Sequence, residues 1–447
     1  MMARGLVVVL ACAACGDNLH RDDLLTAVSG TRLVLQKYRF DDGTEQAVAS
    51  EFYDTQVHAR CTPQPWADGA VRCAPAADEV DYVDPACTVP IGFTRTIDQP
   101  THFIAFATPP GGRVVARVFR AGAERSLITE YYDASSGACV GPVPVPPMPM
   151  NYFEVGDELD ADELVTFHDD EVGDDRIGVQ LHTTDDGLRA PFGLHDRMLD
   201  VPCVPRLQGD GRVACEPATA AAASYFADPA CQEPVVAAAS PPAIAKLVAP
   251  SGCASYARVG PERSVPLYTR TGETCTPVAT PIEGRLYSVA APVELAALGR
   301  TLEAVPGRRL QRILLDHDGL RFLDDRLFDT ATGADCGRRT LRDGVRCLPA
   351  TIAGMTLFRE GCAEQVVVAE VPQPACTRPA YATLNRPFQI RPIGEAVAGP
   401  LFRLDGDVCG PYTGAPGTEL RVVGPPIVLT TFESAIYYGE RPTTPSP

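Results

Sequence analysis

The chain has 447 residues, with 57 acidic residues against 39 basic ones and a formal net charge of −18 at pH 7. Nucleic acids favour basic surfaces because each neutralised phosphate releases a counterion, so this charge excludes a nucleic-acid-binding protein. It equally disfavours attachment to an anionic membrane surface by anything other than an anchor.

The N-terminus has the order of a bacterial signal peptide. Arg4 precedes a short apolar run, Gly5–Ala14, which ends at Cys15 and is too short to span a membrane as a helix. We expect cleavage after residue 14 and a lipid-modified Cys15 as the first mature residue. Cys12 is the alternative, because the residues before it fit a lipoprotein box better, although the apolar run would then be shorter. An ordinary signal peptide with incidental cysteines is the remaining interpretation.

Residues 15–29 are interpreted as a tether. Gly16 rather than an aspartate follows Cys15, which favours the outer membrane, with the mature protein facing the periplasm or the cell surface. The body has no uninterrupted apolar stretch of about 18 residues, so contact with the membrane is expected through the lipid anchor alone.

The cysteine content predicts a disulfide framework. Setting aside Cys12 and Cys15 leaves an even number of the 16 cysteines in an oxidising compartment. The predicted disulfide cysteines are Cys61, Cys73, Cys87, Cys139, Cys203, Cys215, Cys231, Cys253, Cys275, Cys336, Cys347, Cys362, Cys376 and Cys409.

Three repeat units of about 130 to 145 residues follow the tether: residues 30–165, 166–300 and 301–438, before a disordered tail at 439–447. Each unit opens with an arginine, reaches an Asp-Gly pair, and continues with an apolar pair followed by aspartate. Cysteines then recur in a constant order. The recurring arginines and aspartates are Arg32, Asp42 and Asp54, then Arg176, Asp186 and Asp200, then Arg309, Asp318 and Asp329.

The local patterns predict an all-β protein. Ile177, Val179 and Leu181 alternate with polar or small residues, the period of a half-buried strand, and Asp-Gly pairs between such runs indicate hairpins. The 42 prolines disfavour long helices. About eight short strands per unit, in two halves, predict a six-bladed β-propeller. Three β-sandwich-like domains are the alternative, and the lack of linkers between units favours the propeller.

Within each unit the first two cysteines are expected to pair, because they flank one hairpin-like loop. Gln64 is predicted opposite Cys73, so the pair is not directly cross-strand and the loop must bulge. Cys87 and Cys139 remain in the first unit and should pair with each other. The extra cysteines of the later units, Cys253 and Cys376, leave the pairing there open, either across units or locally.

Motifs for chemistry are sparse. Cysteine and histidine spacings do not fit a zinc site, and there is no phosphate-binding glycine loop or hydrolase elbow, so we expect no cofactor. Asp169, Asp170 and Asp174 could supply oxygen ligands to Ca²⁺, but a solvated charged loop is the simpler interpretation.

Recurrence of Asp42, Asp186 and Asp318 could mean a ring of carboxylates, although their place before glycine predicts tight turns. The recurring arginines are expected to form ion pairs with the recurring aspartates of the same unit. Trp66, the single tryptophan, could anchor a glycan or protein partner from an exposed loop, but a cap over its disulfide is preferred.

Four short motifs carry a resemblance to a known group of proteins. They are the tether Ala14-Cys15-Gly16-Asp17-Asn18, Trp66-Ala67-Asp68-Gly69, Arg72-Cys73 and Tyr82-x-Asp84-x-x-Cys87. The chain resembles the uncharacterised, cysteine-containing repeat lipoproteins of GC-rich Gram-negative bacteria, and this resemblance implies no activity.

The sequence therefore predicts a non-catalytic binding or interaction scaffold in the cell envelope, with a protein or glycan of the cell surface as its partner. The alternative is a propeller hydrolase or lyase that acts on polysaccharide through paired carboxylates. A purely structural spacer in the envelope is a third hypothesis.

Overall fold

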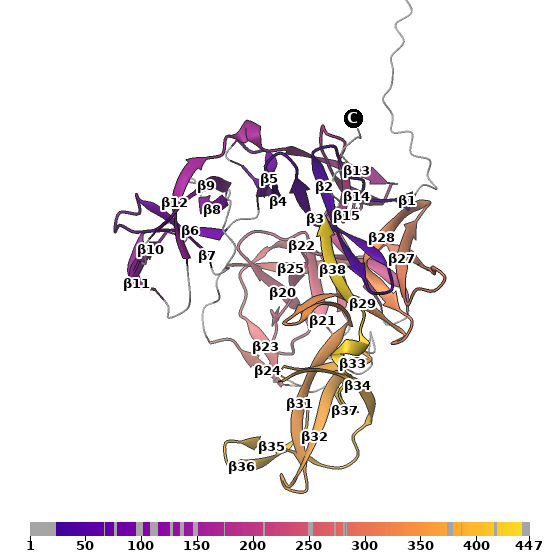
Figure 1. Ribbon diagram of the computed structural model, residues 1–447. Coiled ribbons are helices and arrows are strands. Elements are labelled where there is room, and N and C mark those ends of the chain that lie inside the picture. Colours follow the sequence, from indigo (N-terminus) through magenta and orange to yellow (C-terminus); the bar gives the residue numbers. More distant parts are fainter. Residues whose placement is uncertain are drawn as a thin grey trace, which may run out of the picture.

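The structure is a computed structural model (Figure 1). It describes residues 24–66, 68–75, 78–94, 102–107, 115–125, 128–134, 138–145, 151–173, 175–208, 211–248, 254–271, 274–279, 282, 284–372, 379–385, 387–414 and 418–439. Cys12, Cys15, Asp174, Cys253 and Cys376 lie outside these described residues.

The described chain is all-β, and one large sheet forms its centre. Sixteen strands make this sheet, and all but β1 (Leu24–Leu25) lie in a closed ring, because β28 pairs with both β27 and β29. The ring strands, in chain order, are β2 (Leu33–Phe40), β3 (Glu45–Asp54), β4 (Ala59–Pro65), β5 (Val71–Pro75), β13 (Thr166–Gly173), β14 (Ile177–Thr183), β15 (Arg189–Asp196), β16 (Val201–Leu207), β17 (Val213–Pro217), β26 (Ala297–Glu303), β27 (Leu310–His317), β28 (Leu320–Asp329), β29 (Ala334–Leu341), β30 (Gly344–Pro349) and β38 (Ser434–Gly439).

The strands follow one another around the ring in the order of the sequence, so each repeat occupies one continuous part of the ring. Each repeat gives four consecutive strands and one linking strand, which is β13, β26 or β38, so in the structure the first two repeats end after β13 and β26 rather than at residues 165 and 300. The linking strand of one repeat pairs with the first strand of another. The last strand, β38, closes the ring on β2, where Gln36 lies opposite Gly439.

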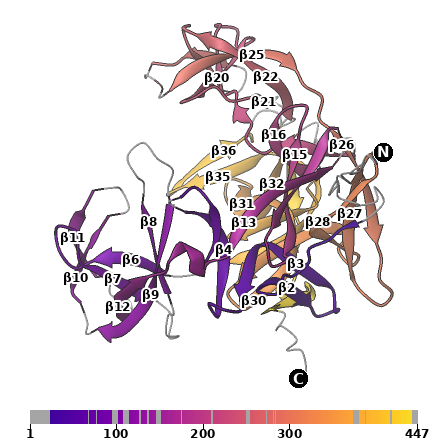
Figure 2. The same ribbon diagram turned by 90° about the horizontal axis from the view of Figure 1, so that it is seen from above.

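An insert leaves the ring between the fourth strand and the linking strand of every repeat, and the three inserts point in different directions (Figure 2). The first contains β6 (Asp78–Tyr82), β7 (Pro90–Thr94), β8 (His102–Ala107), β9 (Val115–Arg125), β10 (Glu130–Asp133), β11 (Val140–Pro144) and β12 (Asn151–Glu158). The second contains β18 (Ala221–Ala222), β19 (Tyr225–Phe226), β20 (Pro234–Ala238), β21 (Ile244–Val248), β22 (Ala254–Arg263), β23 (Tyr268–Thr271), β24 (Thr274–Pro277) and β25 (Arg285–Pro292). The third contains β31 (Thr351–Arg359), β32 (Glu364–Pro372), β33 (Tyr381–Asn385), β34 (Phe388–Ala396), β35 (Leu401–Asp405), β36 (Val408–Tyr412) and β37 (Thr418–Val423).

This topology confirms the all-β prediction and does not confirm a six-bladed propeller. The described strands form four sheets, one closed and three inserted, whereas a propeller needs a separate sheet for each blade. Three independent β-sandwich-like domains do not fit either, because strands of all three repeats share the closed sheet. The first half of each repeat, which was predicted to form one blade, instead supplies its strands to one third of the closed sheet.

The core lies inside the closed sheet. Its largest cluster joins residues from two repeats, among them Ile177, Val179 and Leu181 of β14 and Ile313 and Leu315 of β27. These β14 residues alternate with less buried or smaller ones, as the period of two predicts. Half-buried strands of this kind gain free energy only when their apolar faces meet across the ring, so all three repeats depend on one another.

Each repeat opens with a long hairpin that contains a bulge. In β2 and β3 the register shifts between Leu35 and Gln36, and the equivalent hairpins also shift. Glycines at the Asp-Gly turns have positive φ, which is 81° at Gly43, 94° at Gly187 and 91° at Gly319. The predicted hairpin turns are therefore confirmed, because each uses the conformation that glycine adopts without steric cost.

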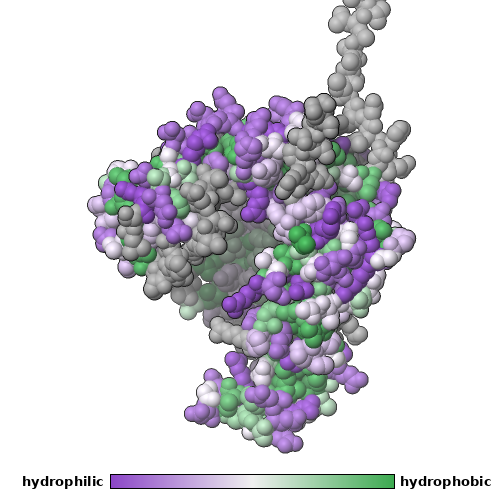
Figure 3. All heavy atoms as spheres, in the orientation of Figure 1, coloured by the Kyte–Doolittle hydropathy of each residue, from purple (hydrophilic) through white to green (hydrophobic). Residues whose placement is uncertain are grey.

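Two short 3-10 turns, η1 (Ala161–Glu163) and η2 (Leu429–Thr431), precede the linking strands of the first and third repeats. Within the described ranges, no helix has the length and apolarity needed to cross a membrane. The face in Figure 3 is hollowed between the first insert, at left, and the closed sheet.

Candidate functional site

The six described disulfides fall on equivalent positions of the three repeats and indicate an oxidising compartment. The predicted pairing of the first two cysteines is confirmed in Cys61–Cys73, Cys203–Cys215 and Cys336–Cys347. The third and fourth cysteines pair as Cys87–Cys139, Cys231–Cys275 and Cys362–Cys409. The first of these was predicted, and the other two resolve part of the pairing that the sequence left open.

The hairpin disulfide links residues that are not directly opposite each other, as expected, but the register differs from the prediction by one. Cys73 lies opposite Pro63 rather than Gln64, and Cys61 lies opposite Pro75. The prediction assumed a two-residue turn at Asp68-Gly69. The N–H of Trp66 instead donates to the carbonyl oxygen of Ala70, which leaves three residues in the turn and shifts the register by one.

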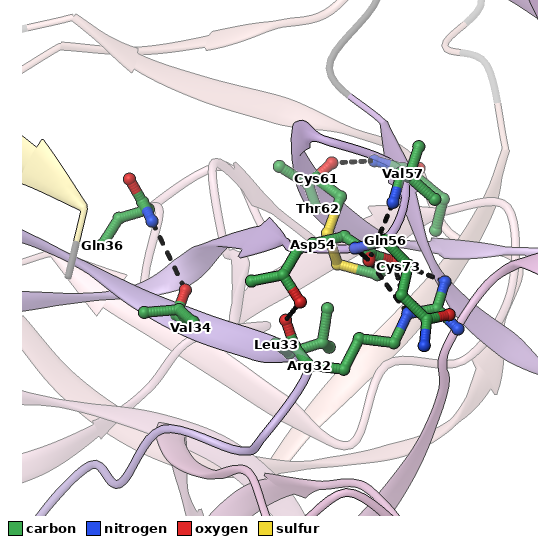
Figure 4. Close-up of a disulfide and its surroundings, with 12 residues drawn as sticks. Arg32, Leu33, Val34, Gln36, Asp54, Gln56, Val57, Cys61, Thr62 and Cys73 are labelled. Atoms are coloured by element: carbon green, nitrogen blue, oxygen red, sulfur yellow. Dashed lines mark hydrogen bonds and ion pairs between the residues drawn. A yellow bond between two sulfur atoms is a disulfide. The ribbon is translucent and has the colours of Figure 1, made fainter. Parts of the chain in front are cut away.

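In each repeat an arginine just before the first strand forms an ion pair with a buried aspartate at the end of the second strand. Arg32 donates from Nη2 to Asp54 Oδ2 at 2.7 Å, and Arg309 donates from Nε to Asp329 Oδ1 at 2.6 Å (Figure 4 shows the first pair). Both aspartate side chains are 1% exposed. The same arginines donate to backbone carbonyls of the segment that leads to the linking strand, at Glu163 and Thr431. These two predicted ion pairs are confirmed, and they hold the ring together.

The second repeat corrects the predicted pairing. Arg176 pairs with Asp196 rather than Asp200, whose side chain is 93% exposed. Leu194 lies opposite Cys203 just as Phe52 lies opposite Cys61, so the equivalent aspartate comes four residues earlier than the sequence comparison placed it. The Nη2–Oδ2 distance is 3.4 Å, which is longer than in the other repeats.

The aspartates of the Asp-Gly turns do not form a ring of carboxylates. Asp186 Oδ2 accepts hydrogen bonds from the N–H groups of Arg32 and Leu33, at 2.7 and 2.8 Å, and therefore joins the second repeat to the first. Asp42 Oδ2 accepts from the N–H of Leu310 at 2.7 Å and joins the first repeat to the third. Burial raises the pKa of Asp186, but hydrogen bonds from Thr184 and from the backbone bring it below its ordinary value. These aspartates hold repeats together.

Two of the three candidate calcium ligands, Asp169 and Asp170, bond to neighbouring side chains. Asp169 Oδ1 lies at hydrogen-bonding distance, 3.0 Å, from His182 Nδ1. Asp170 Oδ2 accepts a hydrogen bond from Thr183 Oγ1 at 2.7 Å. As neighbours in β13 they project to opposite faces of the sheet, and Asp174 lies outside the described residues. Across the part of the chain that the structure describes, no three acidic, histidine or cysteine side chains are grouped as metal ligands.

In the first and third repeats a largely buried arginine lies beside the hairpin disulfide. Arg72 donates to Asp68 Oδ1 at 2.7 Å and to the carbonyl oxygen of Ala161 at 3.1 Å, and it lowers the pKa of Asp68 to about 2. Arg346 bonds Asp343 at 2.9 Å and the carbonyl oxygen of Phe432 at 3.2 Å. Both arginine side chains are 11% exposed. Each therefore fills the space between the hairpin and the segment before the linking strand.

A large apolar side chain completes this filling. Trp66 is 7% exposed and packs in one cluster with Val118, Leu159 and Leu164, so it is not an exposed anchor. Cys61 and Cys73 belong to another cluster, so Trp66 joins the hairpin to the first insert and the expected cap over its disulfide is not found. Leu341 packs against the cluster that contains Phe432 in the third repeat.

The second repeat lacks both fillings and has a cavity of about 580 Å³ there. Ala214 precedes Cys215 where Arg72 and Arg346 precede their cysteines. Gln208 takes the place of Trp66, because its N–H bonds the carbonyl oxygen of Arg212 as Trp66 bonds Ala70. Both residues line the cavity, which has the size of small-molecule sites.

Both apolar and polar residues line the cavity. Val213, Ala214 and Leu295 supply apolar surface, while Arg176, Arg212 and His317 supply cationic or hydrogen-bonding groups. Glu294 also lines it, and its carbonyl oxygen accepts from Arg176 Nη2 at 2.5 Å. The lining residues come from three separate parts of the chain. Arg176 directly precedes β14, Arg212 directly precedes β17, and His317 is the last residue of β27 in the third repeat.

His317 is held in place from one side of its ring. Its Nδ1 donates to the carbonyl oxygen of Ala297 at 2.9 Å, and its Nε2 lies 3.8 Å from Asp318 Oδ2. The side chain is only 15% exposed, whereas that of Asp318 is 82% exposed. This hydrogen bond orients the imidazole at the cavity.

Sequence reasoning missed this site, although a signal was present. The signal is that Ala214-Cys215 breaks the Arg-Cys pattern of Arg72-Cys73 and that Gln208 stands where the first repeat has Trp66. A repeat that loses two large side chains at one junction is the place where a pocket can open.

No curated protein and no solved structure matches this chain. A protein-family comparison does match, and it covers residues 7–432. By that match over nearly its whole length, the chain belongs to a family of unknown function (DUF7481).

Proposed function

We propose that the protein is an exported lipoprotein, held at the outer membrane through Cys15, that serves as a non-catalytic binding scaffold for a protein or glycan of the cell surface. The observation that carries the proposal is the cavity of the second repeat, set in a ring whose equivalent positions are filled in the other two repeats. Disulfides and interlocked repeats make the ring rigid, and rigid scaffolds with variable additions commonly serve recognition.

The recurring carboxylates support binding over hydrolysis. Asp54, Asp196 and Asp329 are at most 1% exposed and paired with arginines, and Asp42 and Asp186 accept backbone N–H groups of neighbouring repeats. A glycosidase needs two carboxyl groups about 5 to 9 Å apart on either side of a substrate. Carboxylates engaged in holding the ring are poor candidates for that task.

The anchor is tested by mass spectrometry of the protein extracted from membranes. We expect the mature N-terminus to be Cys15 carrying diacylglycerol, and the Cys15→Ser variant to lose the lipid and leave the membrane fraction. The matched control, Cys12→Ser, should keep both. Lipid on Cys12 in the native protein would contradict this part of the proposal.

The absence of turnover is tested with envelope polysaccharide from the producing cell. We expect the intact protein to cosediment with the polysaccharide or with a surface protein while releasing no new reducing ends. Release of reducing ends that Asp318→Asn abolishes would replace the scaffold by the hydrolase, because Asp318 is an exposed recurring acid and follows His317, which lines the cavity.

A further inference from the structure

A polar shelf lies on one face of β13, β14 and β15, three neighbouring strands that are labelled at the upper right of Figure 1. The apolar residues of β14 point to the largest core cluster, so Gln180 and His182, which alternate with them, point to the opposite face. On this face the register places Asp169 of β13 opposite His182 and Glu171 opposite Gln180. Two residues of β15 complete the polar shelf, which consists of Asp169, Glu171, Gln180, His182, Phe192 and Gly193.

A bulge turns one phenylalanine onto the shelf. Phe192 is the extra residue of β15, because its two neighbours pair with consecutive residues of β14. Its ring stacks on the imidazole of His182, with centroids 3.9 Å apart and planes 11° apart, and the residue is 39% exposed. A bulge re-aims a side chain in this way. The bulges of the other two repeats, at residues 49–51 and 324–326, carry no aromatic residue.

The exposed ring is supported from the core. His182 lies between Phe192 and the buried Phe167, whose ring centroid is 5.1 Å from that of the imidazole. Burial lowers the pKa of His182, although the carboxylate of Asp169 opposes the shift, so the imidazole beneath the exposed ring is uncharged at neutral pH. A ring held in one orientation loses little conformational freedom when a ligand covers it, and this preorganisation favours binding.

Two glycines keep the shelf low beside the ring. A Cβ atom on Gly193 would lie 2.8 Å from Gln180 Oε1, and one on Gly178 would overlap the carboxylate of Glu171. The side chains of Gln180 and Glu171 therefore lie across the neighbouring strands. Among the residues that the structure describes, none forms a hydrogen bond with the Gln180 amide. The side chain of Asp169 is 60% exposed and uses Oδ1 for His182, which leaves other acceptor positions of this carboxylate to a ligand.

The charges on the shelf favour a neutral ligand. Glu171 pairs with Arg197 at 2.5 Å, so Asp169 carries the unbalanced negative charge. An anionic ligand would be repelled by it, and a cationic one would gain little from a single exposed carboxylate that solvent screens. A pyranose ring matches what remains. Its C–H groups suit the negative face of a phenyl ring, and its hydroxyl groups can bond to a carboxylate and an amide.

We propose that the polar shelf binds a neutral glycan, with one pyranose ring on Phe192 and its hydroxyl groups toward Asp169 and Gln180. This inference rests on the proposed binding function and names a surface and a ligand class for it. The shelf shares no lining residue with the cavity of the second repeat, so the two can be tested separately.

An array of immobilised oligosaccharides tests the ligand class on the intact, disulfide-bonded protein. It carries neutral oligomers of glucose, galactose, mannose and N-acetylglucosamine, together with sulfated and deacetylated, cationic counterparts. We expect retention on neutral oligomers and weaker retention on both charged forms. No retention on any neutral oligomer, or tighter retention on a charged counterpart, overturns the inference.

Variants locate the binding on the shelf. Phe192→Ala should weaken binding of the retained oligomer by about tenfold or more, because the stacking surface is lost, whereas Phe192→Tyr should keep it. Gln180→Ala should weaken it by about fivefold, the usual effect of one hydrogen bond. The matched control is Phe388→Ala in β34 of the third insert, since Phe388 is 38% exposed and lies outside the shelf. It should bind like the native protein.

Two outcomes overturn the location. One is unchanged binding in Phe192→Ala, and the other is an equal loss in Phe192→Ala and Phe388→Ala. The same variants separate this inference from the scaffold proposal. If the native protein and Phe192→Ala cosediment equally with envelope polysaccharide or with a surface protein, the polar shelf is not the binding surface and the scaffold proposal still stands.

Discussion

Asp329→Ala is expected to lower the free energy of unfolding by about 3 kcal/mol or more, the usual cost of removing one partner of a buried ion pair. Asp329 is 1% exposed and accepts two hydrogen bonds of 2.6 Å from Arg309 and one of 2.9 Å from the N–H of Ala331. Its loss removes both of these bonds from Arg309, which keeps a longer contact to Glu433 Oε1 at 3.6 Å. Denaturant unfolding monitored by circular dichroism measures the effect.

A matched control exists on the surface. Arg39 and Glu45 also lie 2.6 Å apart, but their side chains are 58% and 33% exposed. Glu45→Ala should therefore cost less than about 1 kcal/mol, because solvent screens the exposed pair. Equal losses in Asp329→Ala and Glu45→Ala would show that burial does not set the strength of the arginine–aspartate pairs that close the repeats.

Replacing Cys87 and Cys139 together by serine is expected to destabilise the first insert by about 4 kcal/mol. The disulfide closes 52 residues, and loop-closure entropy of the unfolded chain gives this magnitude. Cys87 lies between β6 and β7, and Cys139 lies just before β11, so the disulfide fastens the outer β10–β11 hairpin to the rest of the insert. Hydrogen exchange should rise in the hairpin, residues 128–134 and 138–145, and in residues 78–94.

The rest of the protein supplies the control for that measurement. The Cys336–Cys347 hairpin belongs to the closed sheet of another repeat, so its amide protection should not change. A loss of protection that spreads equally over the ring would contradict the view that each insert can unfold locally while the ring persists.

The sequence by itself determined the local features of this protein. Alternating apolar residues and Asp-Gly pairs predicted the strands and hairpins, because both depend on backbone conformation within a few residues. Recurrence of markers predicted the three repeats and the three hairpin disulfides. It also predicted the pairs of Arg32 with Asp54 and of Arg309 with Asp329, and it failed for Arg176 only because the marker was matched four residues too late.

Only the tertiary structure decided how the strands assemble. The same list of strands can build blades, sandwiches or one ring, since a strand's pattern shows which face is buried but not which edge partner it meets. Pairing of β2 with β38, from opposite ends of the chain, closes the ring, and no local signal encodes it. The cavity is likewise a property of the assembled ring. Residues of the second and third repeats meet around it, and it is open because Gln208 and Ala214 leave unfilled a gap that only the packing of hairpin, linking segment and neighbouring turn creates.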